Sequence, residues 1–321
     1  VITQRTESLN KQRDRLDDAI YVERASMDRQ RIMPVTEVDA DAVPYFSVIL
    51  TAGDRAPKNR QIADRSRPSV SEEATPTSSN ELLVVGLGPA DAKWLTPEAA
   101  EALAQVDHVV GYGPYVDRVP VRPGLQRHSS GNTVEVDRAR FALDLALAGE
   151  KVAVVSGGDA GVFGMASAVF EAAQDSKYAS VPIRVLPGVS AVQAVAARAG
   201  APIGGDFAVM SLSDRLKPWN VIEKRLAAIA EADLVLAIYN PASRSRTTQV
   251  ADAKDVLLRH RPADTVVVIG RDVGRPAEAV EVTTLEKLDP ASIDMKCLLI
   301  IGARGTSVTP SGAVWTKRFV D

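Results

Sequence analysis

Three glycine-rich segments follow apolar runs and contain the residue types that hold a flat or polar ligand through the backbone. They are GLGPADAKWLT (86–96), SGGDAGVFGMA (156–166) and PGVSAVQA (187–194). Glycine has no side chain, so a ligand can approach the backbone of such a loop closely. Because the carboxyl ends of parallel strands meet at one edge of a sheet, the three loops together predict a single ligand pocket.

The first of these segments departs from a dinucleotide-binding fingerprint. In that fingerprint the third glycine opens a helix directly, and an acidic residue that binds the ribose follows about 20 positions later. Here Asp91 stands at the third glycine position, a helix is expected only from Pro97, and the next strand, HVVGYGP, ends without an acid. A nicotinamide-dependent oxidoreductase is therefore disfavoured, and it is kept as the alternative from another class of enzyme.

The elements that position these loops are those of an α/β protein. Buried strands are indicated by ELLVVGLG, KVAVVSGG, PIRVLPG, DFAVMSL, DLVLAIYNP, DTVVVIGRD and KCLLIIGARG. Thr96 and Pro97 mark the start of a helix, and Gly200 marks the end of another. We expect a first subdomain over 81–203 with a mostly parallel sheet. The second, over 204–321, should hold a mixed sheet because the strand–helix alternation stops after Arg271.

Composition excludes several classes of protein. The 321 residues contain 38 Lys plus Arg against 41 Asp plus Glu, a formal charge of −3, which argues against a nucleic-acid binder that works through bulk positive charge. The single cysteine, Cys297, allows neither an intramolecular disulfide nor a multi-cysteine metal site. No apolar run is long enough for a membrane span. We expect a cytoplasmic protein without nucleic-acid or membrane partners.

The stretch 56–80 is rich in Pro, Ser, Thr and charge, and is predicted to be a flexible linker. The segment before it, 1–55, repeats the order of elements seen near the end of the chain. In this comparison Arg24 matches Arg271, and 48–51 matches 298–301. We expect 1–55 to be the carboxyl-terminal remnant of a second module of the same kind, loosely ordered or packed on a neighbour.

The three loops, followed by LAIYNPASRSR and VIGRDVGRP, resemble the tetrapyrrole methylases of cobalamin biosynthesis over 81 to about 308. Within that family, the YNPxSRxR string and the SSGN…E…RA stretch (129–139) are similar to the branch that methylates precorrin-3B at C17. The segment YVERASMDRQRI…PYFSVIL resembles the carboxyl end of the branch that methylates precorrin-2 at C20. A sister methylase acting on another precorrin position, or a non-catalytic scaffold with the same fold, stays open.

The resemblance implies a two-subdomain fold, a homodimer, a tetrapyrrole substrate and S-adenosylmethionine as methyl donor, with no metal. Carried over onto this chain, the cofactor-binding positions are Pro89, Gly157, Gly158, Asp159, Val162, Ser190, Ala191, Asn240 and Gly274. Two departures stand out. Ala90 replaces a glycine that is common in the first loop of the family, and Met165 and Ala168 replace an Arg and a Glu of the uroporphyrinogen-methylating branch. The second departure disfavours uroporphyrinogen as substrate.

A tetrapyrrole of this pathway carries many carboxylates, which forked guanidinium groups bind well. The arginines in loops after strands are Arg244, Arg246, Arg271 and Arg275, which we expect to bind substrate. The implied reaction is attack of C17 on the methyl group with ring contraction to precorrin-4. Positioning matters most for it, and Asp91 and then His128 are the candidates for a general acid or base.

Overall fold

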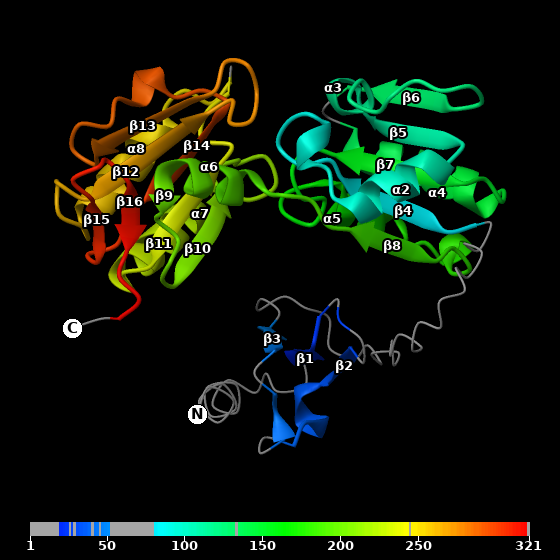
Figure 1. Ribbon diagram of the computed structural model, residues 1–321, viewed down its shortest axis with the longest axis horizontal. Helices are drawn as coiled ribbons and strands as arrows, with labels where there is room; N and C mark the ends of the chain where they lie inside the picture. Colours follow the sequence, from blue (N-terminus) through cyan, green and yellow to red (C-terminus); the bar gives the residue numbers. More distant parts are fainter. Residues whose placement is uncertain are drawn as a thin grey trace. The chain divides into compact units, whose positions relative to one another are not determined.

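The computed structural model describes residues 19–25, 27, 30–39, 42–44, 46–51, 80–131, 134–243 and 245–319. The chain divides into two compact units, Val1–Pro76 and Thr77–Asp321. The linker expected over 56–80 lies outside the described residues except for Asn80. The described residues of the larger unit form two five-stranded sheets, each with its own helices (Figure 1), and one small three-stranded sheet.

The first sheet of the larger unit is fully parallel, as expected. Its strands are β4 (Leu82–Gly86), β5 (His108–Tyr112), β6 (Gln126–Ser130), β7 (Val152–Ser156) and β8 (Ile183–Leu186), in the order β6-β5-β7-β4-β8. The helices are α2 (Pro97–Gln105), α3 (Gly113–Val116), α4 (Glu135–Leu147) and α5 (Met165–Ala172). All side chains of β4 and β7 are buried, because apolar clusters cover both faces of the sheet. The loops after β7, β4 and β8 therefore leave from neighbouring strands at one edge.

The second sheet is mixed, also as expected. Its strands are β10 (Phe207–Ser211), β11 (Val235–Tyr239), β12 (Val266–Arg271), β13 (Ala279–Thr284) and β14 (Cys297–Ile301), in the order β10-β11-β14-β12-β13. Strand β14 is antiparallel to both of its neighbours. Strands β10, β11 and β12 consequently run in the same direction, and their carboxyl ends share one edge. The helices α7 (Trp219–Glu231) and α8 (Gln249–Leu258) pack together with this sheet in one apolar cluster.

Helix α6 (Ala191–Ala199) corrects the expected boundary between the two subdomains. The sequence placed this helix in the first subdomain, which was to end at residue 203. In the structure its Val192 and Val195 lie in one apolar cluster with residues of β11, β12 and β14. The alternation of strands and helices assigned α6 to the preceding strand β8, but its apolar face packs on the second sheet. The chain thus changes subdomain at the start of α6.

Local signals placed the helix ends correctly. The side chain of Thr96 accepts a hydrogen bond from the backbone N–H of Ala99 and begins α2. Gly200 ends α6 with a φ of 132°. Two features were missed: the edge strand β6, whose residues are polar, and a small sheet of β15 (Thr306–Val308), β16 (Val314–Thr316) and β9 (Gly200–Ala201). Neither contains the apolar run that identifies a buried strand.

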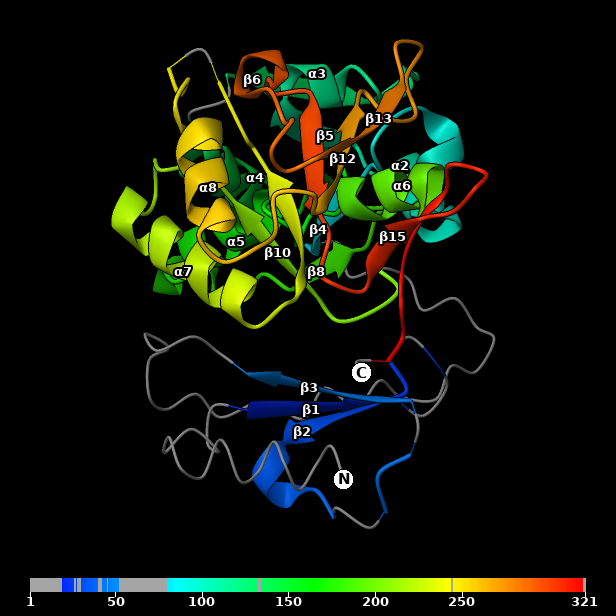
Figure 2. The same cartoon turned by 90° about the vertical axis from the view of Figure 1, so that its left-hand side faces the viewer.

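The smaller unit contains β1 (Ala19–Glu23), β2 (Arg31–Pro34) and β3 (Ser47–Thr51). Strand β1 lies between β2 and β3, and both pairings are antiparallel (Figure 2). This is the arrangement of β12 between β13 and β14. Glu23 pairs with Ser47 as Arg271 pairs with Cys297, so Glu23 is the counterpart of Arg271. The match of Arg24 to Arg271 made from the sequence was wrong by one residue.

The correspondence extends to the connections between strands. The chain from β1 to β2 and the chain from β12 to β13 both have seven residues, 24–30 and 272–278. Each begins with a non-glycine residue of left-handed conformation, Arg24 at φ 51° and Asp272 at φ 46°. In each, the carbonyl oxygen of that residue accepts a hydrogen bond at 2.9 Å from the N–H three positions later. The two segments are therefore alike in order, register and turn geometry.

Candidate active site

The three glycine-rich loops of the first sheet are joined to one another by hydrogen bonds. Gly88 and Gly158 exchange reciprocal backbone hydrogen bonds of 3.0 and 2.8 Å, which connect the first loop to the second. The carboxylate of Asp159 accepts from the N–H of Gly161 at 2.8 Å and from the N–H of Gly188 at 2.9 Å. One side chain thus fixes the second loop and attaches it to the third.

Space between the loops is distributed unevenly. A Cβ atom at Gly188 would lie 2.9 Å from the backbone of Gly86 and would also collide with the carbonyl oxygen of Gly158, so the loops close up there. Gly158 has a φ of +68°, and a Cβ atom built on it would meet only the Cα of Ser190, at 4.0 Å. At Gly158 the backbone of the second loop is therefore much less crowded than the backbone at Gly188, so a ligand can approach it more closely.

Tyr239, at the end of β11, connects the third loop to the second sheet. Its hydroxyl is hydrogen-bonded to the side chain of Ser190 and accepts from the N–H of Val192 at 2.9 Å. Burial raises the pKa of the Tyr239 hydroxyl, so the group stays protonated. The next residue, Asn240, has a φ of 48° and donates from Nδ2 to Ser211 Oγ at 3.0 Å. Asn240 is thereby held at the carboxyl edge of the second sheet, beside the third loop.

The loop 272–278 contacts the first loop. Gly274 has a φ of +86°, and a Cβ atom there would lie 2.7 Å from Trp94 Nε1. Arg275 Nε donates to the carbonyl oxygen of Pro89 at 3.4 Å. The guanidinium of Arg198 lies 5.3 Å from the ring centre of Trp94. Residues from both subdomains that the sequence singled out for the cofactor therefore occupy adjoining loops.

Arg118 is a positioning residue that sequence reasoning missed. Its Nη2 donates to the carbonyl oxygens of Leu87, Gly88 and Ala90. These hydrogen bonds hold the backbone of the first loop in place. Burial, and then the positive charge of Arg275, lower the pKa of Arg118. The residue lies in the sequence YVDRVP, beyond the short helix α3, and no local motif marks it. Only the fold brings it to the first loop.

The two residues expected to act as acid or base lie in different places. Asp91 is in the first loop, where its carboxylate is mostly exposed and lies 3.5 Å from Lys93 Nζ. His128 lies on β6, and its Nε2 is 3.0 Å from Nδ1 of His108, the first residue of β5. His108 in turn lies 3.4 Å from Glu150. His128 is in the middle of β6, the outer strand next to β5, and it contacts the first residue of β5, so no contact joins it to the other candidates.

The four arginines expected to bind substrate have different surroundings. Arg244 lies outside the described residues. Arg246 is buried, its Nε donates to Ser243 Oγ, and its Nη1 has no partner among the described residues. Arg271 is paired with Asp294 at 2.6 Å. Arg275 is paired with Asp272 at 3.7 Å. Of these three, Arg246 therefore keeps an unused donor, Arg271 is paired with a carboxylate, and Arg275 shares the carboxylate of Asp272 with Lys296.

Among the described residues, no group of three or more His, Cys, Asp or Glu side chains is arranged to hold a metal ion. No helix in that part of the chain is long and apolar enough to cross a membrane. The arrangement is instead a set of glycine-rich loops, joined across two α/β subdomains, that presents mainly backbone to a ligand. Such loops can position a ligand and a reacting partner next to each other.

A fold and a site of this kind define a two-subdomain methylase. Residues 81–289 match the model of the family described as Tetrapyrrole (Corrin/Porphyrin) Methylases. The chain belongs to this family.

Three similar proteins indicate the branch of the family to which the chain is most alike. A cobalamin biosynthesis protein CobIJ of Mycobacterium tuberculosis is 49% identical over 310 residues, which is 94% of this chain and 57% of that protein. The chain thus spans little more than half the length of that relative. A precorrin-3B C(17)-methyltransferase of Sinorhizobium sp is 47% identical over 244 residues, covering 74% of this chain and 96% of that enzyme. A crystal structure of the methyltransferase CobJ matches with a TM-score of 0.72 and 42% identity, over 74% of this chain and 99% of that one.

Proposed function

We propose that the unit Thr77–Asp321 transfers a methyl group from S-adenosylmethionine to C17 of precorrin-3B, with ring contraction to precorrin-4. The observation that carries this is the near-complete match to a precorrin-3B C(17)-methyltransferase, at 47% identity over 96% of that enzyme. The site supports it, because the loops are joined across both subdomains and present backbone to a ligand. Metal-free positioning of two reactants suits such a transfer.

The residues present fit S-adenosylmethionine. The uncrowded backbone at Gly158 suits a group held by backbone, and Pro89, Ala191 and Gly274 lie in the adjoining segments. When bound, S-adenosylmethionine supplies an electrophilic methyl group. Asp159 has both carboxylate oxygens engaged by backbone N–H groups, so we assign it to loop positioning. Gly157, Val162, Ser190 and Asn240 complete the proposed set.

Proton transfer during ring contraction requires a group near the loops. Asp91 is the candidate, because it lies in the first loop and its carboxylate is exposed to an incoming substrate. We assign no step to His128, which lies in the middle of the outer strand β6 and contacts His108. An Asp91→Asn variant should lose most of its turnover while keeping S-adenosylhomocysteine affinity. Full turnover in that variant would remove Asp91 from the mechanism.

The proposed function is tested by incubating the protein with S-adenosylmethionine and precorrin-3B and identifying the product by mass and absorbance. Precorrin-2, in a parallel reaction, is the substrate of the sister activity at C20. We expect methylation of precorrin-3B and none of precorrin-2. The reverse pattern would favour the sister methylase. Calorimetric titration with S-adenosylhomocysteine and with NADH separates the methylase from the oxidoreductase.

We also propose that β1–β3 are the counterpart, in a second methylase module, of β12–β14. The equal strand order, register and turn geometry support this, as does a relative that matches 94% of the chain. In the larger unit, the apolar face of β12 and β14 is covered by α6. The equivalent Val48 and Leu50 of β3 are 54% and 55% exposed, so this face lacks such a helix among the described residues.

The homodimer implied by the resemblance stays a prediction, which light scattering tests.

A further inference from the structure

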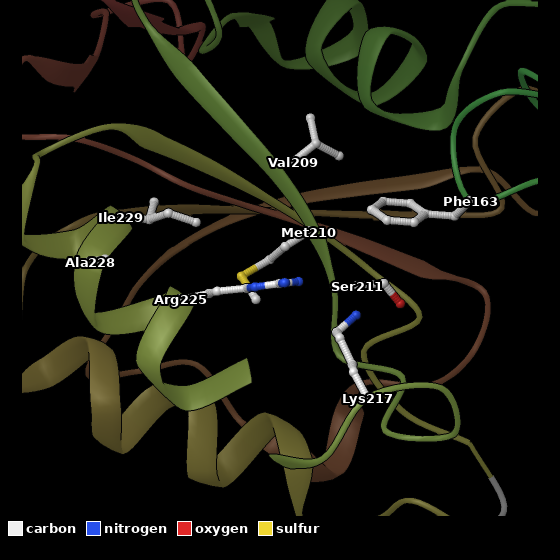
Figure 3. Close-up of a pocket in the computed structure, with 8 residues that line it drawn as sticks. All are labelled: Phe163, Val209, Met210, Ser211, Lys217, Arg225, Ala228 and Ile229. Atoms are coloured by element: carbon white, nitrogen blue, oxygen red, sulfur yellow. The ribbon is translucent and has the colours of Figure 1, made fainter. Parts of the chain in front are cut away.

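A small cavity lies against the edge strand β10, beside the proposed cofactor loops. It has a volume of about 250 Å³ and is lined by Phe163, Met210, Ser211, Lys217 and Arg225, among others (Figure 3). Phe163 comes from the second glycine-rich loop, directly after Val162. Met210 and Ser211 are at the carboxyl end of β10, Lys217 precedes α7, and Arg225 lies on α7. Both subdomains therefore contribute to its wall.

The two cationic side chains of this cavity have no acidic partner in the part of the chain that the structure describes. No hydrogen bond or ion pair joins Lys217 or Arg225 to any other described residue. Figure 3 shows the ammonium of Lys217 and the guanidinium of Arg225 directed into the same space below Met210 and Ser211. Burial, and then the charge of Arg225, lower the pKa of Lys217. Lys217 is partly buried and Arg225 is exposed. Two like charges directed into one space, with no acidic partner among the described residues, favour an anionic ligand.

Ser211 provides a third polar group to the same space. Its Oγ accepts hydrogen bonds from Asn240 Nδ2 at 3.0 Å and from the N–H of Ser213 at 3.2 Å. The hydroxyl proton of Ser211 therefore remains available to a ligand. The hydrogen bond from Asn240 to Ser211 connects the cavity to the proposed cofactor residue Asn240. The ring centres of Phe163, which lines the cavity, and Tyr239 are 5.3 Å apart. An anion bound here would be next to the proposed methyl-transfer site.

We propose that Lys217, Arg225 and Ser211 form a subsite for one side-chain carboxylate of the tetrapyrrole substrate. The inference rests on the proposed function and deepens it. Pockets that enclose a whole small-molecule ligand usually measure about 300–1,000 Å³, so a cavity of about 250 Å³ suits one acetate or propionate arm. The macrocycle itself would then lie outside the cavity, toward the cofactor loops.

The subsite is tested with the whole chain and two probes, cobyrinic acid, a stable corrin polycarboxylate, and its heptamethyl ester. The wild-type protein should bind the acid more tightly than the ester. Lys217→Met and Arg225→Met should each weaken binding of the acid about 10-fold, as loss of a hydrogen bond to a charged group does, and leave ester binding unchanged. Lys224→Met, a change of the same charge at the neighbouring residue of α7 outside the cavity, is the matched control.

Turnover provides a second readout. In the Lys217→Met and Arg225→Met variants, the KM for precorrin-3B should rise about 10-fold while S-adenosylhomocysteine affinity and the urea midpoint stay at wild-type values. Lys217→Arg and Arg225→Lys keep the charge and should restore most of the loss. Equal binding of acid and ester by the wild type, or an unchanged KM in the double Met variant, would overturn the subsite. If the wild type fails to turn over precorrin-3B, the proposed function fails, and the acid–ester comparison still decides on the subsite.

Discussion

Asp159 offers the sharpest test of how the site is built. Its two carboxylate oxygens accept from the N–H groups of Gly161 and Gly188, at 2.8 and 2.9 Å, and so attach the second loop to the third. In an Asp159→Asn variant, the amide oxygen can replace one of these acceptors. The amide NH2 then faces the other N–H, donor against donor, and that hydrogen bond is lost.

The expected cost follows from those two contacts. Loss of one hydrogen bond to a charged acceptor costs about 1.5–3 kcal/mol, and the remaining bond weakens because its acceptor becomes neutral. We expect the free energy of unfolding to fall by about 2–4 kcal/mol. Loosening of the two loops should also weaken S-adenosylhomocysteine binding by at least about tenfold, which corresponds to about 1.4 kcal/mol.

Urea unfolding without ligand and calorimetric titration with S-adenosylhomocysteine measure the two effects. Asp289→Asn is the matched control, since the carboxylate of Asp289 accepts from the single N–H of Ala291 in an exposed turn. Asn replaces Asp well in such a cap, so the control should change stability by less than about 0.5 kcal/mol. Weaker ligand binding by Asp159→Asn with wild-type stability would refute the reasoning, because the carboxylate would then act on the ligand itself.

Three further predictions concern other parts of the chain. Gly188→Ala places a methyl group 2.9 Å from the backbone of Gly86, so overpacking should lower the free energy of unfolding by about 1–3 kcal/mol, measured with urea. The control Gly312→Ala meets open space at φ +86° and should show only a smaller backbone effect. Burial and then the charge of His108 lower the pKa of His128, so the neutral form of this residue stabilises the fold. The stabilisation is complete above the usual histidine pKa of about 6.5, and the urea midpoint should fall as the pH is lowered from about 7.5 to about 5.5. His128→Gln should reduce this fall, and an equal fall in the variant would contradict it. A shortened chain that begins at Thr77 contains all the proposed site residues and should keep the wild-type kcat/KM, whereas a large loss would show that the smaller unit takes part.

Local patterns predicted most of the architecture. The runs of Val, Ile and Leu located the buried strands, and Thr96 and Gly200 located helix ends, because such signals depend on a few neighbouring residues. Strand β6 was missed because an edge strand with polar residues has no apolar run. The assignment of α6 was wrong for a related reason, since the choice between two sheets is made by packing of Val192 and Val195 and not by order along the chain.

The sequence predicted the glycine-rich loops of the candidate site but not the side chains that hold these loops in place or lie beside them. Glycine loops after parallel strands are visible in the sequence, and the fold brings them together as expected. Arg118 and the Lys217–Arg225 pair carry no motif, because they reach the site from elements distant along the chain. Tyr239 is part of the YNPxSRxR string, but its hydrogen bonds to the third loop depend on the fold. Ion pairs are also invisible in the sequence. Arg271 and Arg275 are paired with Asp294 and Asp272 in the fold, and their contact with the substrate stays a prediction.

The most direct test of the central claim is the product formed from precorrin-3B and S-adenosylmethionine by the purified protein. The proposed function predicts a product heavier by one methyl group, with the methyl at C17 by carbon-13 NMR after transfer from labelled donor, and with the absorbance of the ring-contracted macrocycle. A protein that binds S-adenosylhomocysteine but leaves precorrin-3B unmethylated, or that methylates another carbon, would contradict it.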